Sequence, residues 1–117
     1  MTQIASKTVT SADQATGVDI SGITGDVTLL LRVDALSAAS GTPRARIVLE
    51  DSVNAFTNSL PVCEYNIEGP IAAPVQVSWR RYQTPSLRNG VASAVLRVNV
   101  AALEGTSPSL TYTATLL

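Results

Sequence analysis

The sequence predicts an all-β chain, a single antiparallel β-sandwich or jelly-roll-like domain of about seven or eight short strands. Apolar and polar residues alternate along several segments, turn-forming residues separate these segments, and no window repeats apolar residues at helical spacing. The 117 residues match the usual size of one domain, which can fold without a metal or a disulfide. We therefore expect one domain over residues 1–117, with an extended N-terminal arm as the alternative for residues 1–17.

The strands can be placed from the alternation, because successive side chains of a strand point to opposite faces. In the segment 27–35, Leu31 and Val33 fall on one face, whereas Arg32 and Asp34 fall on the other. Further strands are expected at 44–50, 62–67, 75–80, 94–100 and 109–116. The inward residues predict one shared core, which includes Leu29, Leu31, Leu96, Val98 and Leu110.

Turn signals lie between the predicted strands, for example Ser40-Gly41-Thr42-Pro43 and Asn89-Gly90. The chain also contains an internal echo. Leu-Arg-Val-Asp at 31–34 is followed by Gly41, and Leu-Arg-Val-Asn at 96–99 is followed by Gly105. The echo predicts two similar hairpins, unless such short strings recur by chance in a β-rich chain.

The residue types present exclude most catalytic arrangements. The chain has no histidine, and so it lacks the usual general base and the commonest metal ligand. Cys63 is the only cysteine and has no cationic neighbour in the sequence, so we interpret it as a core thiol. These features predict a protein that is not an enzyme and needs no cofactor.

The carboxylates are the remaining candidates for catalysis or metal binding. Glu50-Asp51 and Glu64 with Glu68 are candidate pairs, and Asp13, Asp19 and Asp26 are candidate calcium ligands. None of these groups has the spacing of a known motif, and charges at a strand edge or aspartates in turns explain them better. We expect no catalytic pair and no metal site.

The charge and hydropathy of the chain limit the classes of partner that it is expected to bind. Eight Lys and Arg against nine Asp and Glu give a net charge of −1, which makes nucleic acid an improbable ligand. No secretory signal is expected in the first residues, and no apolar run is long enough to cross a membrane. Only 15% of the residues are charged, so the surface is suited to association with another protein.

One local cluster, Trp79-Arg80-Arg81-Tyr82, combines cationic and aromatic side chains and is followed by a Pro- and Gly-containing segment. Arg and aromatic residues are enriched at protein interfaces and also stack on nucleic-acid bases. The simplest alternative is that Trp79 belongs to the core while Arg80 pairs with a carboxylate. The residues of the candidate protein interface are Arg80, Arg81, Tyr82, Pro85, Leu87 and Arg88.

The order of strand and turn motifs resembles that of small β-sandwich virion proteins of tailed bacteriophages, some of which decorate capsids. The motifs are Asp19-Ile20-Ser21-Gly22, Leu29-Leu30-Leu31-Arg32-Val33, Gly41-Thr42-Pro43, Ile47 to Ser52, Leu96-Arg97-Val98 and Gly105 to Thr111.

The resemblance implies a non-enzymatic capsid decoration or cement protein that binds the outer surface of the assembled head. It further implies the major capsid protein lattice as partner, a trimer or dimer of this chain, and location in the host cytoplasm during assembly. A tail or neck component of the same virion is the alternative. A carbohydrate-binding β-sandwich is a further alternative, although 4% aromatic residues make a sugar-stacking platform hard to build.

Overall fold

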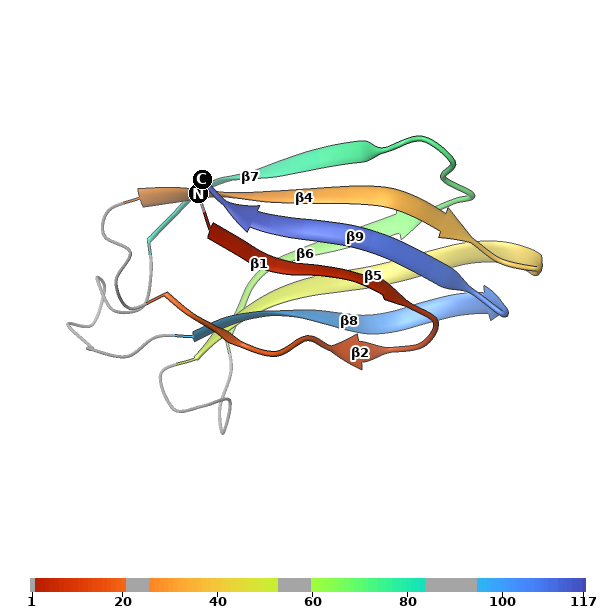
Figure 1. Ribbon diagram of the computed structural model, residues 1–117, viewed down its shortest axis with the longest axis horizontal. Helices are drawn as coiled ribbons and strands as arrows, with labels where there is room; N and C mark the ends of the chain where they lie inside the picture. Colours follow the sequence, from red (N-terminus) through yellow and green to blue (C-terminus); the bar gives the residue numbers. More distant parts are fainter. Residues whose placement is uncertain (1, 21–25, 53–59, 84–94) are drawn as a thin grey trace.

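The computed structural model describes residues 2–20, 26–52, 60–83 and 95–117. These residues form nine strands in two antiparallel sheets, packed face to face as a sandwich (Figure 1). The predicted all-β sandwich is confirmed, and within the described ranges there is no helix. Accordingly, no described segment is a helix of the length and hydropathy needed to cross a membrane.

The two sheets are named here A and B. Sheet A contains, in spatial order, β1 (Thr2–Val9), β9 (Ser109–Leu116), β4 (Asp26–Ser37) and β7 (Val75–Gln83). Sheet B contains β2 (Asp13–Gln14) and β3 (Val18–Asp19), both paired with β8 (Val95–Thr106), and then β5 (Ser40–Ser52) and β6 (Leu60–Glu68).

The strand pairing is that of a jelly roll. β1 pairs with β9, β2 and β3 with β8, β4 with β7, and β5 with β6, so the pairs are nested along the chain. Such nesting arises when one long antiparallel hairpin, with its tip between β5 and β6, rolls up. Successive strand pairs along the hairpin then lie alternately in sheet A and sheet B. The fold is the double-sheet architecture of jelly rolls.

The core lies between the sheets and is built from the inward residues of the strands. In β9, buried and half-buried residues alternate strictly from Ser109 to Leu116. The predicted core is confirmed: each of its members is at most 1% exposed, and they form one cluster, Leu29, Leu31, Leu96, Val98 and Leu110.

The prediction of two hairpins is wrong, because the strands on either side of each turn belong to different sheets. β4 lies in sheet A and β5 in sheet B, and likewise β8 lies in sheet B and β9 in sheet A. The two connections are instead neighbouring corners of the roll, at the same end of the molecule (Figure 1). The Ala39 N–H donates to the carbonyl oxygen of Thr106 across them, at 2.8 Å.

Ser40 to Pro43 also differs from the predicted turn, since these residues belong to β5. Gly41 has φ +77°, and the register between β5 and β8 shifts between Ser40 and Arg44. The glycine therefore marks a bulge within a long strand.

Candidate functional site

The predicted interface residues fall at one edge of sheet A. Arg80, Arg81 and Tyr82 lie in the second half of β7, where Arg81 pairs with Thr28 and Tyr82 with Val27. Arg80 lies at a register shift between these pairs and the rest of the strand. Pro85, Leu87 and Arg88 lie outside the described residues.

The outer face of sheet A is rich in hydroxyl groups, since every outward residue of β9 is a serine or threonine. The hydroxyls of Ser6 and Thr113 are 3.1 Å apart, and those of Thr8 and Thr111 are 2.9 Å apart. These cross-strand hydrogen bonds satisfy the hydroxyls within the sheet. Other members of the face are Thr28, Leu30, Gln76, Ser109 and Thr115.

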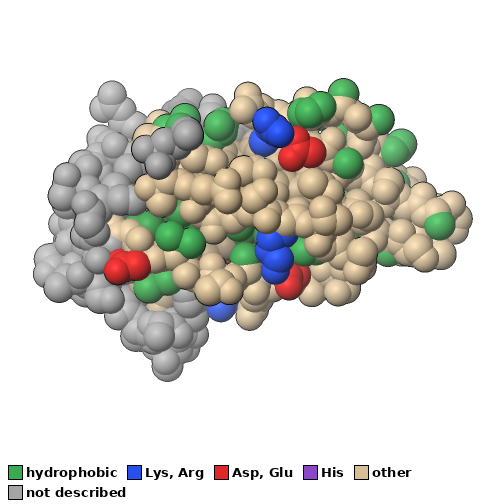
Figure 2. Space-filling view, viewed as in Figure 1, with side chains coloured by type: hydrophobic (Ala, Val, Ile, Leu, Met, Phe, Trp, Pro, Cys, Tyr) green, Lys and Arg blue, Asp and Glu red, His purple; other side chains and the backbone are tan. Residues whose placement is uncertain are grey.

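Among the side chains of this face that the structure describes, charge is sparse and compensated. Arg32 and Asp34 form an ion pair with 2.7 Å between Nε and Oδ1. Figure 2 views the molecule as in Figure 1, and the blue side chains near its upper edge and its centre lie next to red ones. The outer face of sheet A can therefore be removed from water with few unpaired charges.

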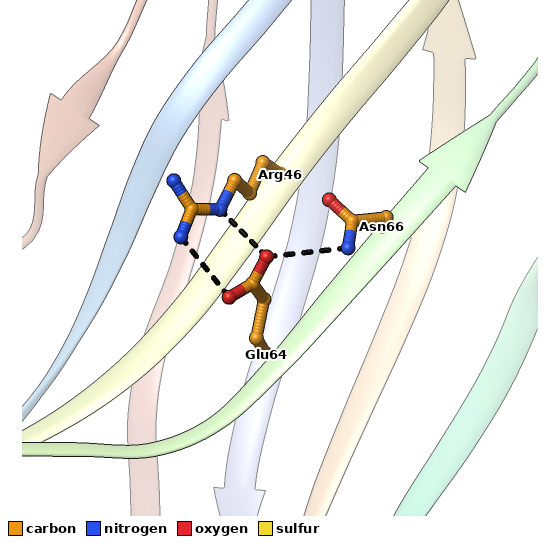
Figure 3. A network of polar contacts seen from close by, with 3 residues as sticks. All are labelled: Arg46, Glu64 and Asn66. Carbon is orange, nitrogen blue, oxygen red and sulfur yellow. Dashed lines mark hydrogen bonds and ion pairs between the residues drawn. The ribbon is translucent and has the colours of Figure 1, made fainter.

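The outer face of sheet B is different, because ion pairs cross its strands (Figure 3). Arg46 on β5 donates to both carboxylate oxygens of Glu64 on β6, at 2.6 and 3.0 Å. The amide of Asn66 donates to the same carboxylate at 3.2 Å. These hydrogen bonds, above all that from Arg46, lower the pKa of Glu64, and the bond to Glu64 raises the pKa of Arg46.

A groove of about 300 Å³ lies next to this network on the outer face of sheet B. Charged side chains of three adjacent strands line it, and Arg44 lies between Glu68 and Glu104 in the cross-strand register. The complete lining is Arg44, Ala45, Arg46, Asn66, Ile67, Glu68, Ala102 and Glu104.

Towards the other end of sheet B, three consecutive polar residues of β5 are buried. Glu50 is only 8% exposed and lies 3.5 Å from the Arg97 guanidinium. Asp51 and Ser52, which follow it on β5, are also buried. The ion pair with Arg97 offsets part of the cost of burying the Glu50 charge.

At the open side between β1 and β2, an ion pair joins the two sheets. Lys7 Nζ lies 2.6 Å from Asp13 Oδ2. Tyr112, which pairs with Lys7 in the sheet, is fully buried, and among the described residues its hydroxyl has no hydrogen-bond partner. Burial, and then the nearby Asp13 charge, raise the pKa of Tyr112 to about 12.

Cys63 is a half-buried thiol packed against the core, as its position on an inward face predicted. Burial raises its pKa to about 12. A thiol with such a pKa is protonated at neutral pH and is a poor nucleophile.

The aspartates considered as calcium ligands do not converge. Asp13 pairs with Val100 and Asp19 with Val95, five positions apart on β8 or about 17 Å. Asp26 lies in the other sheet, opposite Gln83. Across the part of the chain that the structure describes, no three His, Cys, Asp or Glu residues are grouped closely enough to hold a metal ion.

The two outer faces are thus the candidate functional surfaces, one hydroxyl-rich and nearly neutral, the other charged and grooved. The sequence indicated the first through its alternating threonines. It did not indicate the groove, because the groove depends on the register between three strands. A comparison of the chain with protein-family models, curated proteins and solved structures finds no match in any of the three.

Proposed function

We propose that this chain is a non-enzymatic virion structural protein that binds the outer surface of an assembled phage capsid as a decoration or cement protein. The observation that carries the proposal is the outer face of sheet A, whose described side chains are regularly arranged, carry little net charge and are hydrogen-bonded to one another. The motif resemblance points to the same class of protein. Jelly rolls are also common in viral capsid proteins, although a fold alone does not define a function.

The face is suited to protein contact because burying it would cost little. Its Ser and Thr hydroxyls already bond to each other, as in the Ser6–Thr113 pair, so a partner does not have to supply hydrogen bonds. The Arg32–Asp34 ion pair on this face brings no net charge. Apolar contact with Leu30 and the threonine methyl groups would then favour association.

The size of the face favours binding to a lattice over binding to a single subunit. Four strands about 4.8 Å apart, the shortest of them 8 residues long, give a face of roughly 500 Å². A standard interface buries about 800 Å² per partner, so one such contact is weak. A trimer or dimer on a matching symmetry axis of the shell would engage several faces at once and gain affinity through effective concentration.

The proposal is tested by mixing the purified protein with phage particles that lack it, pelleting the particles, and counting bound copies by quantitative mass spectrometry. Decoration predicts hundreds of copies per particle in a symmetry-related number, and particles that withstand heating better than bare ones. A count of about six or twelve, or recovery only with tails, contradicts decoration and favours the tail or neck alternative.

A further inference from the structure

We propose that the groove on the outer face of sheet B binds the side chain of an arginine presented by a partner protein. The inference goes beyond the proposed function. It concerns the opposite face of the sandwich and can be tested on the isolated chain.

The first argument is charge. The groove and the adjoining network bring together three carboxylates, Glu64, Glu68 and Glu104, and two guanidiniums, Arg44 and Arg46, for a net charge of −1. Arg46 makes two hydrogen bonds to Glu64, which compensate its charge. Once the Arg46–Glu64 pair is set aside, the groove has two carboxylates, Glu68 and Glu104, and one guanidinium, Arg44. This excess of one negative charge attracts a cation.

The second argument is that one carboxylate is unengaged. Arg44 pairs with Glu68 at 3.6 Å, which is an ion pair beyond hydrogen-bond distance. Glu104, opposite Arg44 on the other side, forms no ion pair with any described residue and is exposed. An incoming guanidinium can therefore bind Glu104 while Arg44 stays with Glu68.

The third argument is the shape and lining of the groove. Ala102 contributes apolar atoms beside Arg46, while the long charged side chains stand at the sides of the groove; Ala45 and Ile67, which also border it, are core residues only 4% and 8% exposed. Ala102 pairs with Arg46, so a small side chain lies next to a long one in the same row. An arginine matches this lining, because its alkyl stem packs on apolar atoms while its planar head binds a carboxylate through two hydrogen bonds.

The test uses N-acetyl-arginine amide as the probe and the neutral analogue N-acetyl-citrulline amide as its control. Each is titrated into the isotope-labelled protein while amide chemical shifts are recorded. We expect the arginine probe to shift the amides of Ala45, Ile67 and Ala102 with a dissociation constant on the order of millimolar, as suits a ligand of its size. The citrulline probe should leave them in place, and added salt should weaken the arginine effect.

Substitutions of single carboxylates identify where on the protein the arginine probe binds. Glu104→Gln should weaken the arginine probe about two- to fivefold, the range of an exposed ion pair. Glu68→Gln with Glu104→Gln should abolish the shifts. Asp34→Asn removes one carboxylate from the other face and should leave binding unchanged. Equal shifts with both probes, no localised shifts, or equal binding by Glu104→Gln and wild type, with the fold intact by thermal unfolding, would overturn the inference.

Discussion

Leu31 and Leu96 represent the core at the scale of single residues, since both are fully buried and come from different sheets. Leu31→Ala or Leu96→Ala should lower the free energy of unfolding by about 2–5 kcal/mol, through lost burial and a residual cavity. Leu30→Ala, next to Leu31 but on the outer face, should cost less than about 1 kcal/mol. Urea denaturation measures all three. Equal costs for Leu30→Ala and Leu31→Ala would contradict the assigned inward face.

Tyr112 differs from these leucines, because it is a buried residue whose hydroxyl group does not contribute to the free energy of unfolding. Its hydroxyl has no hydrogen-bond partner among the described residues. Tyr112→Phe should therefore leave the free energy of unfolding unchanged or raise it by about 1 kcal/mol. A loss of more than about 1 kcal/mol in urea denaturation would show that the hydroxyl is bonded after all.

Tyr112 also makes a prediction for alkaline pH. Its pKa in the folded protein is raised to about 12 from an ordinary value of 10.0, mainly by burial. Between these values the unfolded chain releases the proton and the folded chain keeps it, so stability present below pH 10 is lost as the pH rises towards 12.

Cys63 acts in the same direction, with its pKa raised from 9.0 to about 12, so the comparison belongs in a Cys63→Ala background. In that background, Tyr112→Phe should lose less stability than its parent between about pH 8 and about pH 11. Identical pH profiles of the free energy of unfolding would disprove a buried, protonated Tyr112.

At the scale of the elements, two glycines shape the neighbouring corners of the roll and provide a matched pair. Both have positive φ, +77° at Gly41 and +116° at Gly105. A Cβ at Gly105 would lie 2.8 Å from the Cβ of Ala38, whereas one at Gly41 would meet nothing within 4 Å.

Gly105→Ala should therefore lower the melting temperature more than Gly41→Ala. Each substitution bears the backbone strain of roughly 1–2 kcal/mol, and only Gly105→Ala adds a clash. Differential scanning calorimetry distinguishes the two variants. Equal or reversed losses would mean that the corners are not packed against each other as described.

The elements also show what the sequence could and could not predict. The strands from β4 to β9 have regular alternation and were located, whereas β1 to β3 were not. In β1 a register shift between Gln3 and Ala5 brings Ile4 and Ala5 together as adjacent buried residues, which destroys the period of two. β2 and β3 have two residues each, too few to show any period.

The candidate surfaces were predictable only in part, for a related physical reason. Which residues face outward follows from alternation within one strand, so the hydroxyl face could be anticipated from Thr111, Thr113 and Thr115. Which residues meet across strands depends on register, and register depends on connections and bulges. The Arg46–Glu64 pair joins residues whose opposition no local pattern encodes.

At the scale of the whole molecule, the jelly roll separates two surfaces with different chemistry. Sheet A presents the nearly neutral hydroxyl face, and sheet B presents the charged face with its groove. A protein that decorates a lattice needs a surface for the shell and a second surface that remains accessible. We propose that sheet A makes the contact with the shell.

The most direct test of this assignment is the number of copies bound per particle for two lysine substitutions. Thr113→Lys places a charge in the middle of the sheet A face, whereas Thr106→Lys places the same charge at an exposed position beside the corner of the roll. Both proteins are first checked for an unchanged melting temperature. Copies counted by mass spectrometry after pelleting should fall by at least about tenfold for Thr113→Lys, because an unpaired charge would be buried, and stay at the wild-type number for Thr106→Lys. Wild-type occupancy by Thr113→Lys, or an equal loss by both variants, would contradict the account.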